Sequence, residues 1–211
     1  MSDQETLRRI GESVPERFVD LLVIHCAATP NGGSLFIGKP GDDHFMTPDL
    51  VIDIGHVKRG FRRAETWRKR FNPGLVAIGY HFLIGANGAL YTGRHIDEIG
   101  SHAHISGKTY NQRSLGISML GTDRFTLAQW ERLAQLVAVL QRKYEKVQDF
   151  KIVGHRDLSP DLDDDGVVEE VEWLKICPGF DVAAWLANGM RPDPAHVFDP
   201  QPPAAAMKQA A

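Results

Sequence analysis

Two histidines and one cysteine in this chain have the types and surroundings of a catalytic metal site. His25 follows the apolar run LLVI, His155 follows KIVG, and Cys177 lies in KICPGF. Each alone has an ordinary structural explanation, because a histidine at a strand end is usually hydrogen-bonded and a cysteine can be an inert buried thiol. Together, two imidazoles and one thiolate are the three protein ligands that a catalytic zinc ion takes, with the fourth position left for water. Such an ion lowers the pKa of its bound water to about 7, which gives a hydroxide able to attack an amide carbonyl.

Amide hydrolysis also needs a group that stabilises the negative charge on the carbonyl oxygen and a group that transfers protons. Lys175 lies two residues before Cys177 and supplies a cation near the expected metal. Tyr80, in the segment GYHF, supplies a phenol. Cys26 directly follows His25, so its side chain points to the opposite face of the strand, and we expect a buried thiol rather than a ligand. A disulfide between Cys26 and Cys177, the only two cysteines, is left open.

A second kind of metal site is indicated by the acidic segment at 161–172, DLDDDGVVEEVE. Its residues fit the twelve-residue calcium loop of an EF-hand, in which alternate carboxylates converge on one ion and a glycine permits a sharp turn. The expected ligands are Asp161, Asp163, Asp165, the carbonyl of Val167 and, in bidentate fashion, Glu172. The flanking helices of an EF-hand pair are absent from the pattern, and a solvated acidic loop is the alternative. If calcium binds, it would fold the segment that carries Lys175 and Cys177, so we predict one catalytic zinc ion and one structural calcium ion.

The elements that must position these residues alternate between strands and helices. Segments 20–29, 114–120 and 149–155 are apolar and read as strands, and 78–94 reads as a hairpin that turns at Ala86-Asn87-Gly88. A helix is expected over 47–60, with Leu50, Ile54 and Val57 on its buried face. A long helix begins after Thr126, with Gln129 completing a capping box and a buried stripe of Leu133, Leu136, Val137 and Leu140. A short helix is expected over 181–186. The pattern predicts an α/β fold with one domain and a central mixed β-sheet flanked by helices.

Five segments occur in the order found in the zinc-dependent N-acetylmuramoyl-L-alanine amidases of the amidase-type phage lysozyme and peptidoglycan recognition protein family. They are VIHCAAT, IGYHFLIGANGALYTGR, GSHA, YNQRSLGISMLG and GHRDLSP followed by KICPGFDV. The chain resembles this family from about residue 20 to residue 186. The resemblance implies the amidase fold, zinc at His25, His155 and Cys177, and assistance to catalysis from Tyr80 and Lys175. It also implies that His102 and Asn111 line the substrate cleft, and that the bond cleaved joins N-acetylmuramic acid to L-alanine in peptidoglycan.

The chain departs from the family pattern at Ser118, where some relatives carry a catalytic glutamate. The resemblance then implies that general-base work falls to the zinc hydroxide and Tyr80, as in the phage branch. A second departure is the basic insertion 62–73, RRAETWRKRFNP, which is either a positive patch toward an anionic wall polymer or a solvated helix face. The resulting organisation is an N-terminal helical extension at 1–19, a zinc amidase domain at 20–189 that includes the loop 161–172, and a Pro/Ala-rich tail at 190–211.

Composition limits the possible partners. The chain has 211 residues, 43% of them hydrophobic, and a formal net charge of −3, so no nucleic-acid partner is expected. No signal peptide and no membrane-inserted segment are recognised. The leading hypothesis is a monomeric phage or prophage endolysin. It is expected to wait in the host cytoplasm until it is released to the cell wall, where it lyses the host.

Three alternatives stay open. A cytoplasmic amidase that recycles muropeptides is the nearest rival. A peptidoglycan recognition module that binds without cutting is disfavoured, because relatives of that kind typically lose the zinc cysteine. Contact with a phage RNA polymerase is a property of some amidase-type phage lysozymes, and no residue here identifies such a surface.

Overall fold

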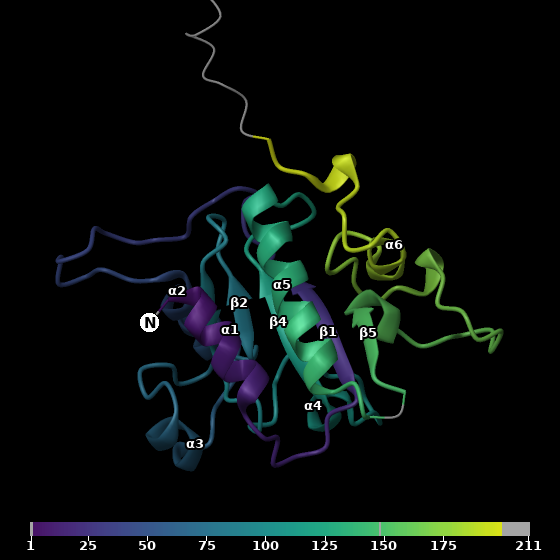
Figure 1. The fold of residues 1–211 in the computed structure, drawn as a ribbon, viewed down its shortest axis with the longest axis horizontal. Helices are drawn as coiled ribbons and strands as arrows, with labels where there is room; N and C mark the ends of the chain where they lie inside the picture. The colour runs from purple at the N-terminus through teal and green to yellow at the C-terminus, as the bar shows by residue number, and fades with distance from the viewer. Residues whose placement is uncertain (1, 148, 200–211) are drawn as a thin grey trace, which may run out of the picture.

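A five-stranded sheet with helices on both sides forms the centre of the protein in the computed structural model, which describes residues 2–147 and 149–199 (Figure 1). The strands are β1 (Leu21–Cys26), β2 (Phe82–Ile84), β3 (Leu90–Thr92), β4 (Ser114–Met119) and β5 (Lys151–Gly154). The α-helices are α1 (Asp3–Glu12), α2 (Pro48–Lys58), α3 (Glu65–Arg70), α4 (Tyr110–Arg113), α5 (Leu127–Lys143) and α6 (Val182–Ala187). Short 3-10 turns follow at η1 (Arg156–Leu158), η2 (Glu170–Glu172) and η3 (Pro194–His196).

The order of strands in the sheet is β3-β2-β4-β1-β5. Strands β2, β4, β1 and β5 run parallel, and β3 pairs antiparallel with β2 at the edge, so the predicted mixed sheet and the predicted hairpin are confirmed. Every residue of β1 and β4 is buried, as parallel strands covered on both faces require. The carboxyl ends of the parallel strands meet at one edge of the sheet, where side chains of an α/β protein project into a cleft.

Alternate residues of β1 divide the core between the two faces of the sheet. Leu22, Ile24 and Cys26 pack in the large cluster with the apolar stripe of α5, and α1 lies against α5 on this side (Figure 1). Leu21 and Val23 pack on the other side. His25 shares their parity, so its ring points away from α5.

Helix α5 forms as its sequence predicts. The hydroxyl of Thr126 accepts a hydrogen bond from the backbone N–H of Gln129, and the Gln129 side chain accepts one from the N–H of Thr126. The predicted stripe is completely buried: Leu133, Leu136, Val137 and Leu140. The helix therefore covers one face of the sheet and leaves the other to the site.

Helix α2 has the expected position, and Leu50 packs against a core cluster as predicted, but the other two residues of the predicted buried face are wrong. Ile54 and Val57 are more than a third exposed, whereas Ile52, Asp53 and His56 are buried. The carboxylate of Asp53 accepts hydrogen bonds from the backbone N–H groups of residues 76–78, and Nδ1 of His56 accepts one from Gly79. The polar side of the helix faces inward because it must satisfy the backbone of the segment leading to β2.

Both ends of the described chain pack on the domain. Leu7 and Ile10 of α1 belong to the main core cluster. Residues 190–199, which the sequence assigns to the tail, run beside Phe125, whose backbone pairs with His196 and Phe198. The rest of that tail, 200–211, lies outside the described residues. None of the helices within residues 2–147 and 149–199 has both the length and the apolar composition of a membrane span.

Candidate active site

The structure brings the three expected zinc ligands together at the carboxyl edge of the sheet. His25 is the fifth residue of β1, and His155 directly follows β5, which pairs in parallel with β1. The ligand atoms of His25, His155 and Cys177 all lie within 4.8 Å of one another. Nδ1 of His25 faces the Cys177 sulfur at 3.7 Å. Two imidazole nitrogens and one sulfur at this spacing suit a single tetrahedral zinc ion.

Cys177 is distant in sequence from His25, and hydrogen bonds from backbone N–H groups hold it beside the two histidines. The N–H of Arg156 donates to the carbonyl of Cys177 at 2.7 Å, and the N–H of Cys26 donates to the Cys177 sulfur at 3.2 Å. An N–H directed at sulfur stabilises a thiolate, which is the form that binds metal. The segment 175–182 is thus fixed against the ends of β1 and β5.

Cys26 is a buried thiol on the α5 side of the sheet, as its position after His25 predicts. Both cysteines are free, so the disulfide that the sequence left open is not formed. The neighbouring Cys177 lowers the pKa of Cys26 to about 7, and the neighbouring Cys26 together with burial raises the pKa of Cys177. This contact was not predicted, because it depends on where residue 177 returns to the sheet.

A cleft of about 440 Å³ opens over the three ligands. It is lined by Tyr80, His102, Asn111 and Lys175 together with the ligands, and also by His56, Arg59 and Phe61 of α2 and the turn after it. The Tyr80 ring lies 5.2 Å from the His25 ring, and Lys175 is exposed at the rim. Every residue predicted for catalysis or substrate binding therefore borders one cavity. It was not predicted from the sequence that α2 lines the cleft, because the spacing of its apolar residues indicated a different buried face.

The protonation states of the site residues follow from their burial. Burial and the nearby Lys175 cation lower the pKa of His155 to about 4. Burial, then His155 and His102, lower the pKa of His25 well below its ordinary value. Burial and the neighbouring Cys177 raise the pKa of Tyr80 above its ordinary value. At neutral pH the imidazoles are therefore uncharged, as metal ligands must be, and the phenol keeps its proton as a hydrogen-bond donor.

Ser118 occupies the strand position at which some members of the resembled family carry a catalytic glutamate. It is fully buried on β4, in register with His25 of the adjacent strand. A hydroxyl at this position cannot act as a carboxylate base at neutral pH. General-base chemistry in this cleft must therefore come from elsewhere.

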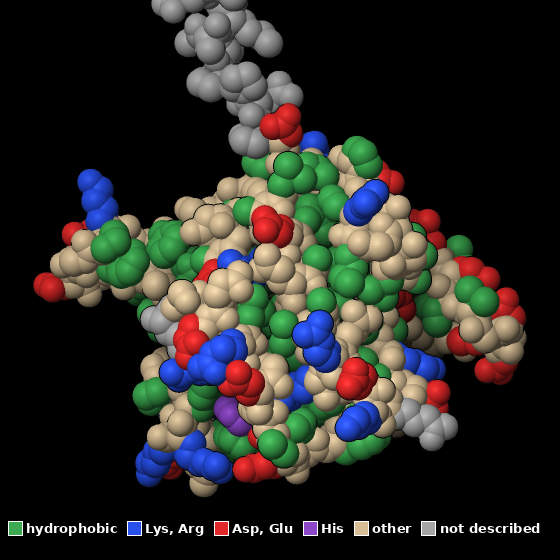
Figure 2. All heavy atoms as spheres, in the orientation of Figure 1, with side chains coloured by type: hydrophobic (Ala, Val, Ile, Leu, Met, Phe, Trp, Pro, Cys, Tyr) green, Lys and Arg blue, Asp and Glu red, His purple; other side chains and the backbone are tan. Residues whose placement is uncertain are grey.

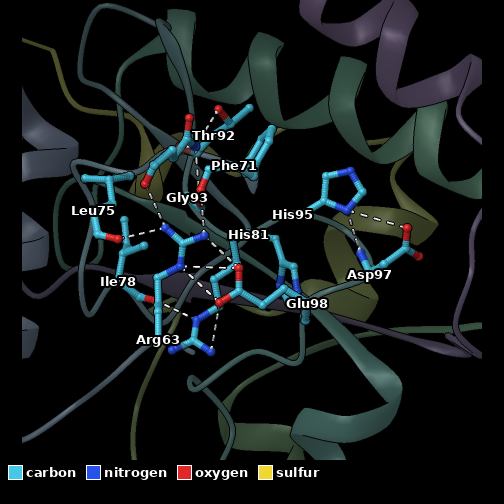
Figure 3. A network of polar contacts seen from close by, with 12 residues as sticks. Arg63, Phe71, Leu75, Ile78, His81, Thr92, Gly93, His95, Asp97 and Glu98 are labelled. Atoms are coloured by element: carbon cyan, nitrogen blue, oxygen red, sulfur yellow. Dashed lines mark hydrogen bonds and ion pairs between the residues drawn. The ribbon is translucent and has the colours of Figure 1, made fainter. Parts of the chain in front are cut away.

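The loop that carries His102 is fixed by a buried ionic network (Figure 3). Arg63 from the basic insertion pairs with Glu98 at 2.7 Å, and both side chains are almost fully buried. Arg94 also lies near Glu98 and donates to the carbonyls of Ile78 and Ile99. The two parts of the insertion 62–73 therefore have different environments. Arg63 is a core residue, whereas α3 has no buried residue and presents a solvated helix face.

The acidic loop lies between β5 and α6 and projects at the right edge of the molecule (Figures 1 and 2). Asp161, Asp163 and Glu172 form one group with ligand oxygens within 4.8 Å, and Asp163 and Asp165 form a second group with Glu169. Gly166 has φ +89°, the positive value expected for the glycine of a calcium loop. The four predicted carboxylate ligands are therefore neighbours, although their oxygens do not all fall in one group.

A family model described as N-acetylmuramoyl-L-alanine amidase matches residues 15–179. The chain therefore belongs to the N-acetylmuramoyl-L-alanine amidase family, and the resemblance inferred from its sequence segments is confirmed. Proteins of this family hydrolyse the amide between N-acetylmuramic acid and L-alanine in peptidoglycan.

Several known proteins are similar to this chain. The endolysin of Enterobacteria phage T3 is 31% identical over 179 residues, which cover 81% of this chain and 87% of that protein. An uncharacterized protein of Haemophilus influenzae is 44% identical over 108 residues, 47% of this chain and 87% of that protein. Among solved structures, the endolysin amidase LysCS from Clostridium intestinale is 27% identical, with a TM-score of 0.49 and coverage of 78% of each chain.

Proposed function

We propose that the protein is a zinc-dependent peptidoglycan amidase that acts as an endolysin. The observation that carries the zinc is the grouping of His25, His155 and Cys177 within 4.8 Å at the base of the cleft. The donor set fits the ion, because the two histidines are neutral and a zinc ion would displace the proton from the Cys177 sulfur, which receives a backbone N–H. The similarity to a phage endolysin over most of both chains supports the lytic role.

A zinc ion at these ligands would supply an activated water and polarise the amide carbonyl. The other groups in the cleft act on the charges and protons of the reaction. Tyr80 holds its proton and borders the ligands, so its phenol can donate a hydrogen bond to the carbonyl oxygen as negative charge develops there. Lys175 places an ammonium at the same cleft, where it stabilises that charge. Tyr80 and Lys175 are also the groups in the cleft that can protonate the departing L-alanine nitrogen, since the Ser118 hydroxyl is not acidic enough to do so.

The test compares Cys177→Ser with Tyr80→Phe in purified protein. For Cys177→Ser we expect loss of both the bound zinc, measured by elemental analysis, and the release of new L-alanine N-termini from purified peptidoglycan. For Tyr80→Phe we expect retained zinc and a kcat lower by about 10²–10³-fold, the usual cost of one donor to an oxyanion. A wild-type protein that holds no zinc and exposes no new L-alanine N-termini would exclude the enzyme and leave a module that binds the wall without cutting.

The endolysin role and the recycling role differ in their substrate. An endolysin must cut intact, insoluble sacculi, whereas a recycling amidase prefers small soluble muropeptides. We propose the intact wall as substrate and a monomer as the active form, held in the host cytoplasm until lysis. A rate on soluble muropeptides far above the rate on sacculi would reverse this assignment. Contact with a phage RNA polymerase stays an open alternative, which a pull-down with that enzyme would decide.

For the loop 161–172 we propose a structural calcium ion. The proposal is supported by the two overlapping carboxylate groups and by the glycine in the left-handed conformation. Both oxygens of Glu172 already accept backbone hydrogen bonds, from Leu162 and Glu169, and so hold the loop closed. Calcium is expected to raise the melting temperature of the wild type, and Glu172→Gln is expected to remove that increase. An equal melting temperature with calcium and with a calcium chelator would leave a solvated acidic loop.

A further inference from the structure

The two nitrogens of the His25 ring have different partners. Nδ1 faces the Cys177 sulfur at 3.7 Å, whereas Nε2 lies 3.0 Å from Nδ1 of His102 in a buried contact. A neutral imidazole carries its hydrogen on one nitrogen only. If Nδ1 of His25 binds a cation, its Nε2 must carry the hydrogen, and Nδ1 of His102 must be the acceptor.

The His102 ring is held in place from three sides. The side-chain oxygen of Asn111 accepts hydrogen bonds from the backbone N–H groups of His102 and Ala103, each at 2.9 Å. The ring packs directly on Gly100 and Gly116, where an added Cβ would lie only 2.5 Å and 2.7 Å from ring atoms. Only glycine leaves room for the ring at these two positions, so the ring is closely packed where it contacts His25.

The second nitrogen of His102 also faces protein rather than the open cleft. Nε2 of His102 lies 3.5 Å from the Ser114 hydroxyl, and His102 is only 8% exposed. Both of its ring nitrogens are thus directed at protein groups, although an edge of the side chain borders the cleft. This arrangement does not suit a side chain whose role is to hydrogen-bond the substrate.

The loop that supplies His102 is anchored independently of any metal. Nε2 of His81 donates to the carbonyl of Glu98 at 2.8 Å, and Nδ1 of His81 accepts a hydrogen bond from Gly116 at 3.0 Å. The Glu98 carboxylate is in turn fixed by Arg63 (Figure 3). The loop therefore presents the His102 acceptor to His25 before a ligand binds.

We propose that His102 is a positioning residue that acts through His25: its Nδ1 accepts the Nε2 hydrogen of His25 and so presents the unprotonated Nδ1 of His25 to the metal. The inference rests on the metal site of the proposed function, and it gives His102 a role other than the substrate contact that the family resemblance implied. Groups that orient a ligating histidine in this way typically contribute about 10–100-fold to metal affinity.

The first measurement uses unmutated, metal-free protein, labelled with ¹⁵N in its histidines. We expect chemical shifts that place the hydrogen of His25 on Nε2 and leave Nδ1 unprotonated. The opposite tautomer would overturn the proposal. Because this experiment needs no metal, it can succeed even if the protein binds no zinc, which separates failure of this inference from failure of the proposed function.

The second measurement compares variants by zinc competition with a chelator. His102→Ala is expected to lower zinc affinity by about 10–100-fold, and His102→Asn, whose side-chain oxygen lies near the position of Nδ1, is expected to recover most of the loss. His44→Ala, at an exposed histidine outside the cleft, is the matched control and should bind zinc as the wild type does. Unchanged zinc affinity in His102→Ala with a raised KM for peptidoglycan would make His102 a substrate contact and overturn the proposal.

Discussion

The pair of Arg63 and Glu98 should be one of the most sensitive points of the fold outside the hydrophobic core. Glu98 is 2% exposed, and its carboxylate accepts three hydrogen bonds from Arg63 and lies 3.5 Å from Arg94. Both arginines also donate to backbone carbonyls of the segments around β2 and β3. Burial lowers the pKa of Arg94 to about 10, while Glu98 opposes that shift. One carboxylate therefore compensates two buried guanidinium groups.

Glu98→Gln keeps the size and shape of the side chain but removes its charge. Breaking a buried ion pair at one partner costs about 3–5 kcal/mol, because the remaining charge stays buried and uncompensated. In a domain of this size, that loss lowers the melting temperature by roughly 6–20 °C. Urea unfolding followed by circular dichroism would measure the free energy, and the m-value shows whether the compactness of the end states is unchanged.

Glu65→Gln is the matched control, since Glu65 pairs with Lys69 at 2.7 Å on α3 with both side chains mostly exposed. An exposed pair spaced i, i+4 contributes about 0.3–0.5 kcal/mol. A loss in Glu98→Gln no larger than the loss in Glu65→Gln would refute the reasoning, because it would mean that the buried guanidinium groups find water or new partners at little cost.

Two further predictions concern single interactions. Burial lowers the pKa of His56 from 6.5 to about 4. Between these two values the folded state binds fewer protons than the unfolded state. The buried neutral ring therefore contributes stability to the fold that is fully present above pH 6.5 and is lost as the pH falls toward 4. The stability advantage of the wild type over His56→Gln should therefore shrink by about 2 kcal/mol between pH 8 and pH 5, and an advantage that stays constant with pH would contradict the assignment of a neutral buried ring. Thr126→Ala removes the N-terminal cap of α5 and should cost about 1 kcal/mol in urea unfolding, whereas Thr126→Ser should cost little; equal losses in both variants would show that the hydroxyl is not the stabilising group.

Local patterns in the sequence were sufficient for much of the framework. The capping box at Thr126 and the stripe beginning at Leu133 describe α5 as it forms, because a helix repeats its environment every three to four residues. The apolar run before His25 predicted a fully buried strand. The same reasoning failed for α2, where backbone groups from residues 76–79 required Asp53 and His56 to face inward. The orientation of α2 is therefore set by hydrogen bonds to residues 76–79, and not by the spacing of its apolar residues.

The residue types in the chain determined which chemistry is available: two imidazoles, one thiolate, a phenol and an ammonium suited to amide hydrolysis with zinc. Only the tertiary structure decided which atoms meet. Parallel pairing of β1 with β5 places His25 beside His155, and the return of residue 177 brings its sulfur to both. The contact between His25 and His102, and the burial of Arg63 against Glu98, likewise join segments far apart in sequence. No local periodicity encodes such contacts, because they depend on the order of strands in the sheet and on the space that Gly100 and Gly116 leave for one ring.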